Sequence, residues 1–249
     1  MTRRRFLVAE WRELAMLNYE IAPAVLRPLV PAGTELEQWG GGGMLYVSVV
    51  GFRFVSTRVF GIAVPGHVDF EEVNLRFYVR RREAGEWRRG VVFVREIVPR
   101  QAIAWMARLW YNEPYRALPM RHRVERRADG APLAVAYEWQ QAGRWEGLSL
   151  RTTGEAAPLA AGSEAEFITE HYWGYTRQRD GSAIEYRVEH PPWRVWGANE
   201  ARLDCDAAAL YGPAFAEALA APVRSAFLAE GSEVTVFRPR RLPREVGPE

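Results

Sequence analysis

The sequence predicts an α+β fold that is mainly antiparallel β, with a curved sheet or β-barrel and a few short helices. Strand-like segments recur at short spacing along most of the chain, and helical periodicity is confined to short stretches. Turn signals such as Asp180-Gly181 separate neighbouring strand segments. No linker, repeat or low-complexity segment divides the chain, so we expect a single domain over residues 1–249. Its core should run from about residue 6 to 241, with a frayed tail at 242–249.

The first predicted strands have distinct burial patterns. Residues 44–50 are β-branched and apolar and follow the glycine run 40–43. Residues 72–80 alternate, with an apolar face from Val73 to Val79 and a polar face that includes Asn74 and Arg76. Residues 90–98 are apolar on both faces apart from Arg95 and Glu96, which indicates a central strand paired with 72–80. Further strands are expected at 132–140, 144–153, 170–178, 183–190 and 232–239.

Helices are predicted in three places. Residues 23–30 begin with Pro23, and residues 99–110 begin with Pro99, because proline is tolerated in the first turn of a helix. Residues 206–210 follow an aspartate N-cap at Asp206. These segments are few and short beside the strands, which keeps the prediction mainly β.

The amino-acid composition limits the reactions and partners that we expect for this protein. The 33 basic residues are all arginine, and the formal net charge is only +2. A guanidinium stays protonated, so it cannot form a Schiff base with a carbonyl as a lysine amine does. The small charge excess does not favour a nucleic-acid partner. No apolar run of about 18 residues indicates a membrane span, and the apolar stretch 6–9 is too short for a signal peptide, so we expect a cytoplasmic protein without a membrane partner.

Metal and thiol chemistry have weak support in the sequence. The four histidines show no paired metal-ligand spacing. His67, Asp69 and Glu71 alternate and could meet a metal on one strand face, but a turn leading into a strand is the favoured interpretation. The single cysteine, Cys205, excludes an internal disulfide, and its neighbouring aspartates oppose a thiolate. We expect no metal and no cofactor.

An aromatic and titratable segment pair is the most distinctive candidate site. Residues 167–175 and 185–193 should form one hairpin that combines rings, histidines and carboxylates. This combination suits a ligand pocket, although a sheet core with mutually satisfied polar groups explains it equally well. The acid–base candidates are Glu170, His171, Glu189 and His190. The ligand-binding candidates here are Trp173, Tyr175 and Tyr186.

A second set of candidates shares one strand face. Glu72, Asn74 and Arg76 alternate along the predicted strand 72–80 and could extend the polar lining of a pocket. The alternative is the solvated outer face of the sheet. The face that they occupy decides between the two interpretations.

Residues 70–79, 167–175 and 228–234 resemble the YqjF-like family (domain of unknown function 2071), and the resemblance runs from about residue 6 to 241. That family is in turn similar to the acetoacetate decarboxylase superfamily, through Arg12-Glu13, residues 26–31 and residues 95–101. The resemblance implies an acetoacetate-decarboxylase-like fold, a mainly antiparallel, cone-like β-barrel with the pocket inside.

The same resemblance implies roles for single positions. Arg12 falls where the decarboxylases keep an active-site arginine, and Ser48 falls near one of their glutamates. Arg100 and Gln101 stand where those enzymes have two lysines, the Schiff-base lysine and the neighbour that lowers its pKa. The imine mechanism is therefore closed to this chain. Arg12 and Arg100 near an aromatic cavity would instead favour an anionic ligand.

The expected function is binding of a small anionic or carbonyl ligand, such as an organic acid, in an internal cavity and without Schiff-base chemistry. Whether the protein is an enzyme is left open, and a lyase or hydrolase that does not use lysine fits the same residues. The alternative is a non-catalytic ligand-sensing or structural oligomeric module, since a fold does not fix a function. Homo-oligomerisation is left open as well.

Overall fold

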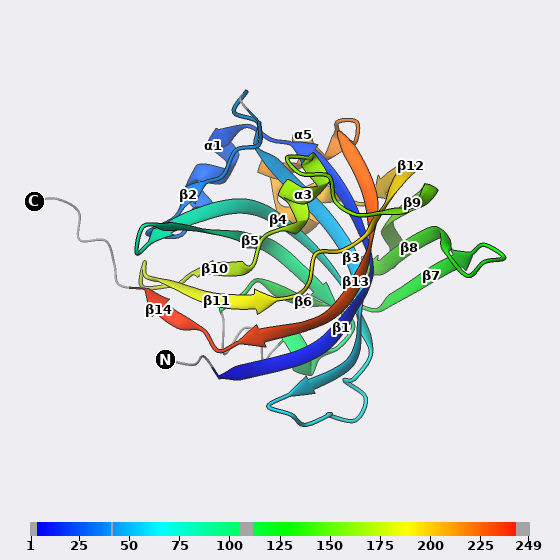
Figure 1. Cartoon of the computed structure of the whole chain (residues 1–249), viewed down its shortest axis with the longest axis horizontal. Helices are drawn as coiled ribbons and strands as arrows, with labels where there is room; N and C mark the ends of the chain where they lie inside the picture. Colours follow the sequence, from blue (N-terminus) through cyan, green and yellow to red (C-terminus); the bar gives the residue numbers. More distant parts are fainter. Residues whose placement is uncertain (1–3, 41, 105–111, 243–249) are drawn as a thin grey trace, which may run out of the picture.

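The computed structural model describes residues 4–40, 42–104 and 112–242 and shows a strongly curved sheet with short helices around it (Figure 1). Within those residues, all fourteen strands belong to one sheet. The strands are β1 (Arg5–Glu20), β2 (Glu35–Leu36), β3 (Tyr46–Val59), β4 (Phe70–Glu83), β5 (Glu86–Val98), β6 (Tyr115–Ala117), β7 (Met120–Arg126), β8 (Pro132–Gln141), β9 (Arg144–Ala157), β10 (Trp173–Arg177), β11 (Ala183–Glu189), β12 (Val195–Asp204), β13 (Ser225–Phe237) and β14 (Arg240–Leu242). The helices are α1 (Pro23–Leu26), the 3-10 turn η1 (Arg27–Leu29), α3 (Glu164–Thr169), α4 (Ala207–Tyr211) and α5 (Pro213–Ala220).

The sheet closes on itself. Strands β11, β10, β5, β4, β3, β1 and β13 follow one another in the sheet, and β11 also pairs with β13. That last pairing joins Val188 to Val236 and Glu189 to Thr235, so these strands form a ring. Neighbours in the ring are antiparallel except β5 and β10. The predicted fold class, a mainly antiparallel curved sheet with few short helices, is confirmed.

Beyond β13 the sheet continues as a wing. Strands β12, β9, β8 and β7 extend from β13 and lie beside the ring (Figure 1). Tyr137 of β8 packs directly on Gly51 of β3, where an added Cβ would lie 2.6 Å from the tyrosine ring. The Tyr137 hydroxyl also donates to the Glu13 carbonyl at 2.8 Å. The wing therefore covers the outer face of the ring and buries an outer core, whose members include Leu17, Val49, Leu75, Phe77, Tyr137, Trp139 and Leu148.

This outer core fixes which face of β4 looks inward. Successive side chains of a strand point to opposite faces. Val73, Leu75, Phe77 and Val79 of β4 pack in the outer core. The alternate, polar residues of the same strand therefore point into the ring. The two faces predicted for residues 72–80 are confirmed, and the polar face lies inside.

Predicted element bounds differ from the structure where the backbone leaves its regular period. The long strand β1 was not predicted, because a positive φ of 56° at Glu13 and register shifts interrupt its alternation. The predicted strand 170–178 begins only at Trp173, because α3 precedes it and is capped by Ser163, which accepts from the Glu166 amide. The hairpin of β10 and β11 around Asp180-Gly181 is confirmed.

The helix predictions are met in part. The aspartate cap is confirmed, since the Asp206 side chain accepts from the Ala209 amide at 2.9 Å. The predicted helix 23–30 is divided into α1 and η1. Residues 101–104 are helical, and the rest of the predicted helix after residue 104 lies outside the described residues. Of the predicted tail, Leu242 belongs to β14 and is buried, and residues 243–249 lie outside the described residues.

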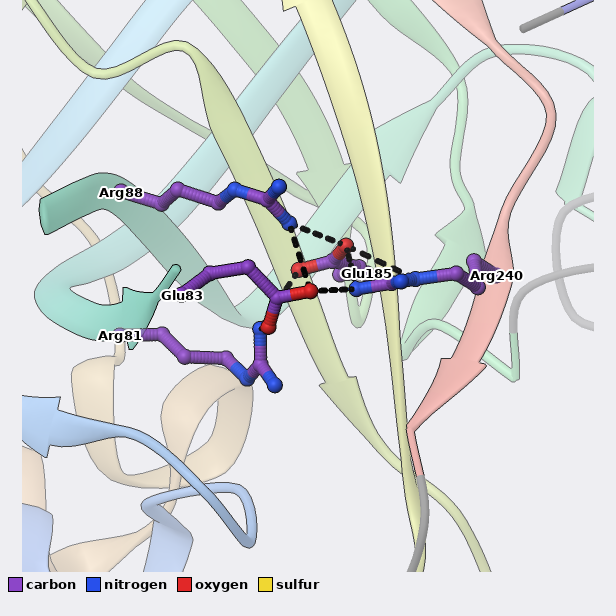
Figure 2. Close-up of polar contacts among 5 residues, drawn as sticks. All are labelled: Arg81, Glu83, Arg88, Glu185 and Arg240. Carbon is purple, nitrogen blue, oxygen red and sulfur yellow. Dashed lines mark hydrogen bonds and ion pairs between the residues drawn. The ribbon is translucent and has the colours of Figure 1, made fainter. Parts of the chain in front are cut away.

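A buried ion cluster ties the ring together where β14 joins it. Figure 2 shows Glu185 of β11 between the arginines of the β4–β5 hairpin and of β14. Glu185 is fully buried and lies 2.9 Å from Arg88 Nη1 and 2.7 Å from Arg240 Nη2. Arg240 also binds Glu83 at 2.9 Å, and Arg81 binds Glu83 as well. Strand β10 joins β5 through only two residue pairs, so this cluster adds a second connection across that part of the ring.

Replacing Glu185 with glutamine should strongly destabilise the fold. The variant leaves Arg88 and Arg240, whose side chains are 25% and 47% exposed, without the buried carboxylate that they share, and losing hydrogen bonds to a charged group costs about 1.5–3 kcal/mol. The free energy of unfolding, measured by urea denaturation, reports the loss. Glu138→Gln is the matched control, because its partner Arg121 lies on an exposed part of the wing and the midpoint should barely change. Equal midpoints for the two variants would contradict a structural role for the cluster.

Candidate functional site

The ring encloses a cavity of about 130 Å³. One wall of the cavity is aromatic and comes from strands and loops far apart in the sequence. Trp11 of β1 meets Phe52 and Phe54 of β3 edge to face, at centroid distances of 5.2 and 5.8 Å. Phe54 in turn stacks on Phe70 at 4.6 Å. Such a wall favours the apolar part of a small ligand.

The lining also includes three buried carboxyl groups, those of Glu72, Glu96 and Glu113, and Glu72 lies opposite Phe52 of the aromatic wall in the pairing of β3 and β4. The Tyr115 hydroxyl donates to Glu72 Oε2 at 3.2 Å, and Asn74 Nδ2 donates to Glu72 Oε1 at 3.0 Å. Glu113 Oε1 accepts from the hydroxyls of Tyr186 and Thr176. We call Glu72, Glu96, Glu113 and Tyr115 the carboxyl cluster.

Glu96 reaches the cavity because of a β-bulge in β5. The register with β4 shifts between Leu75↔Arg95 and Arg76↔Phe93, which leaves Val94 as an extra residue. Phe93 lines the cavity, so regular alternation would turn Arg95 inward and Glu96 outward. With the bulge, Glu96 lines the cavity, and Arg95 Nε donates to the Leu210 carbonyl on the other side at 3.2 Å.

A glycine makes room for the phenol that holds Glu113. Gly174 of β10 pairs with Tyr186 of β11. A Cβ at Gly174 would lie 2.1 Å from the Tyr186 ring, closer than real Cβ contacts come. Glycine is therefore required here for Tyr186 to lie across β10 and donate to Glu113.

Burial raises the pKa of all three carboxyl groups. For Glu72 and Glu113 the pKa rises from 4.5 to about 7, although hydrogen bonds from Asn74, Tyr115 and Tyr186 oppose the rise. For Glu96 burial raises the pKa well above the ordinary value, and the neighbouring charges of Glu113 and Glu72 raise it further. The carboxyl cluster therefore holds protons at neutral pH.

Three buried polar atoms of the cavity lining have no hydrogen-bond partner among the described residues: Asn74 Oδ1, Arg76 Nε and Glu96 Oε2. Arg76 reaches the Ile168 carbonyl through Nη2 at 3.3 Å. A buried polar atom without a partner is costly, so atoms left in this state at a cavity are suited to receive a ligand.

Two histidines line the cavity in their neutral form. Burial lowers the pKa of both His171 and His190 to about 4. His171 Nε2 lies 2.9 Å from Glu37 Oε2. Although burial opposes ionisation of Glu37, its hydrogen bonds with His171 and Arg89 and the charge of Arg89 outweigh that effect and lower its pKa. Neutral His171 therefore donates from Nε2 and keeps Nδ1 as an acceptor.

The structure brings half of the residues expected at the site to this cavity. The predicted site residues that line it are Glu72, Asn74, Arg76, His171, Trp173, Tyr186 and His190.

The other candidates from the aromatic segments and the resemblance lie elsewhere. Glu170 accepts from the Tyr172 hydroxyl, and Glu189 pairs with Arg187 at 3.0 Å. Tyr175 packs in the outer core. The Ser48 hydroxyl contacts Asn18 and Tyr78, each at 2.6 Å.

The three positions expected at the ligand from the decarboxylase resemblance also fall outside the lining. Arg12 pairs with Glu10 at 2.7 Å and is 38% exposed, and Arg100 and Gln101 are exposed. The structure therefore does not bring Arg12 and Arg100 together at the cavity. Among the described lining residues Arg76 supplies the only guanidinium.

Glu96, Glu113 and Tyr115 belong to the site but were not predicted. Because of the bulge, the alternation of the strand does not predict that Glu96 faces the cavity. Its position beside Arg95 in an otherwise apolar strand was nevertheless a signal in the sequence. Glu113 and Tyr115 come from a short segment that pairs parallel with β5 and has no alternation to read.

Metal-binding clusters and membrane-spanning helices were sought among the described residues. In residues 4–40, 42–104 and 112–242, no group of three or more histidines, cysteines and acids is arranged to hold a metal ion. Among the same residues, no helix is both long and apolar enough to cross a membrane. The absence of a metal and a cofactor stays a prediction.

Comparison with known proteins gives a family and a fold. The model of the DUF2071 family, described as an uncharacterized conserved protein, matches residues 8–233. The uncharacterized protein YqjF of Bacillus subtilis (strain 168) is 25% identical over 201 residues, which are 76% of this chain and 74% of YqjF.

Solved structures of acetoacetate decarboxylase-like proteins share the fold. Acetoacetate decarboxylase from Legionella pneumophila is similar with a TM-score of 0.66 and 15% identity, covering 98% of this chain and 90% of the decarboxylase. The enduracididine biosynthesis enzyme MppR complexed with pyruvate is similar with a TM-score of 0.67 and 12% identity, covering 98% and 92% of the two chains. At these identities the likeness shows the fold alone.

Replacing Glu72 with glutamine should make the protein more stable at pH 8 and change its stability little at pH 4. The folded-state pKa of Glu72 is raised, so the native state binds more protons than the unfolded chain and loses stability as pH rises from about 4.5 to 7. Removing one carboxyl relieves that loss by on the order of 1–3 kcal/mol, at about 1.4 kcal/mol per pKa unit.

Thermal melting between pH 4 and pH 8 measures this effect, with Glu138→Gln on the exposed wing as the control. A pH profile of Glu72→Gln that runs parallel to that of the wild type would contradict the raised pKa of the cluster.

Proposed function

Since the chain belongs to the DUF2071 family of uncharacterized conserved proteins, we propose that it binds a small organic acid with a carbonyl group in the cavity of the ring. We propose further that it does so without forming an imine, because its sequence contains no lysine that could supply the amine. The observation that carries the proposal is that Arg76 and the carboxyl cluster line the same cavity as the aromatic wall.

The residues that line the cavity can bind each chemical group of such a ligand. The guanidinium of Arg76 suits a carboxylate, with which it forms charge-assisted hydrogen bonds. A protonated carboxyl group in the cluster suits a carbonyl oxygen, to which it can donate. The aromatic wall around Phe52 and Trp11 accommodates the apolar remainder.

The shared fold is consistent with a ligand of this class. MppR, which has the same fold, is complexed with pyruvate, a small acid with a carbonyl group. The likeness extends over nearly the whole chain, which supports the proposal of a related ligand for this fold.

A structural oligomeric module is the second candidate, and one surface feature favours it. The loop between β3 and β4 exposes Phe60, Ile62 and Val64 by 42%, 66% and 44%. Exposed apolar side chains in a cluster are typical of contact surfaces. Light scattering at increasing protein concentration tests this candidate, with Ile62→Ser expected to dissociate an oligomer; a wild-type monomer at all concentrations would exclude it.

Replacing Arg76 with glutamine should weaken binding of small oxo acids by about 10- to 100-fold, because hydrogen bonds to charged groups contribute about 1.5–3 kcal/mol. Acetone lacks the carboxylate, so its weaker interaction should not change. Isothermal titration with pyruvate and acetoacetate measures the affinities.

Arg123→Gln is the matched control, because Arg123 lies on β7 of the wing with its side chain 76% exposed. Equal affinities of wild type, Arg76→Gln and Arg123→Gln for pyruvate would overturn the role of Arg76. Absence of any binding by the wild type would overturn the proposed ligand class.

A further inference from the structure

The three carboxyl groups of the cluster are held in different ways. Glu72 and Glu113 each accept two hydrogen bonds from side chains, which stabilise their ionised forms. Glu96 is 1% exposed, and its Oε2 has no partner among the described residues. The Oδ1 atom of Asn74, which is 2% exposed and lies opposite Glu96 in the pairing of β4 and β5, also has no partner among the described residues. Glu96 Oε2 is thus the carboxyl oxygen placed to exchange a proton with a ligand.

Burial separates the protonation of these groups. Burial raises the pKa of Glu96 well above its ordinary value, and the pKa of Glu72 rises to about 7. The two hydrogen bonds that Glu72 accepts favour its ionised form, whereas Glu96 Oε2 accepts none from the described residues, so a protonated and an ionised carboxyl can coexist in the cavity near neutral pH. Two carboxyl groups whose environments separate their pKa values in this way can act as an acid and a base.

Tyr115 connects the acid and the base. Its hydroxyl donates to Glu72 Oε2 at 3.2 Å, and Tyr115 lies opposite Glu96 in the parallel pairing of β5 and β6. A hydrogen bond with Tyr115 also opposes the rise in the pKa of Glu96. A proton can thus return from Glu72 to Glu96 through the phenol after each cycle.

We propose that the carboxyl cluster catalyses keto–enol interconversion of a bound 2-oxo acid by proton transfer at the carbon next to the carbonyl group. This inference rests on the proposed function, since it requires the ligand to lie with its carboxylate at Arg76 and its carbonyl oxygen at Glu96.

The step balances within the site. Ionised Glu72 removes a proton from the carbon next to the carbonyl, and the electron pair of that C–H bond forms the C=C bond of the enol. The carbonyl π pair takes the proton of Glu96. Glu72 is then neutral and Glu96 ionised, and proton transfer through Tyr115 restores both. No oxidant, metal or amine takes part.

Groups on several elements set the pH dependence. Glu72 and Arg76 come from β4, Glu96 from β5, Glu113 and Tyr115 from the β6 segment, Tyr186 from β11, and His171 and His190 from the connections around the β10–β11 hairpin. Activity should rise through about pH 7 as Glu72 loses its proton. It should fall at higher pH, where Glu96 loses the proton that it donates.

The test measures by NMR how fast the methyl protons of pyruvate exchange in D2O. Phenylpyruvate serves as a second probe. The wild type should exchange pyruvate protons well above the buffer rate. Glu72→Gln should slow exchange at least about 100-fold, as expected for loss of a general base. Glu138→Gln, on the exposed wing, should match the wild type.

Tyr115→Phe tests the inference through the pH profile of exchange, which a purely structural role of Tyr115 would leave unchanged. The Tyr115 hydrogen bond lowers the pKa of Glu72, so its loss should move the rising limb of the exchange profile to higher pH. This variant also decides the matter if Glu72→Gln fails to fold, because an unshifted profile would then overturn the inference.

The outcomes separate this inference from the proposed function. Binding of pyruvate by the wild type with exchange at the buffer rate would overturn proton transfer and leave the binding proposal intact. Equal exchange by the wild type and Glu72→Gln would overturn the assignment of the base. Failure of the wild type to bind pyruvate or phenylpyruvate would overturn both. Exchange that is lost in Glu72→Gln while pyruvate binding is kept supports the inference.

Discussion

The cavity depends on closure of the sheet at β11, which pairs with β10, β13 and β14. β11 pairs with β10 on one side and with β13 on the other, so a sheet that begins at the N-terminal strand returns to it. The buried contacts of Glu185 with Arg88 and Arg240 hold the β4–β5 hairpin and β14 to this strand (Figure 2). Without this closure, the inward face of β4 would be one side of an open sheet.

Closure also explains why a polar strand face is buried. In a sheet with one solvated face, residues such as Glu72 and Arg76 would be expected on the outside. Here the wing covers the outer face with Tyr137 and Trp139, and the apolar residues of β4 pack against it. The carboxyl groups are left inside the ring, where burial raises their pKa values. The fold therefore both encloses these carboxyl groups and raises their pKa values.

Much of the fold could be predicted from the sequence, because alternation reports strand faces directly. The two faces of residues 72–80 and the hairpin at Asp180-Gly181 follow from local pattern alone. The site was less accessible, because its residues meet through irregular backbone. Glu96 depends on a bulge, and Tyr115 lies in a strand of three residues. Arg12 matched the decarboxylase pattern in sequence, yet its side chain pairs with Glu10 beside it.

The bulge at Val94 reverses which residues face the cavity in the part of β5 that follows it. Before it, odd-numbered residues such as Phe93 line the cavity, and after it even-numbered residues such as Glu96 do. Glutamate and arginine stand side by side at this point, so one extra residue selects which of them the cavity receives. The number of residues between Phe93 and Glu96 therefore decides whether a carboxyl group or a guanidinium enters the cavity at this point. The composition of the strand does not decide it.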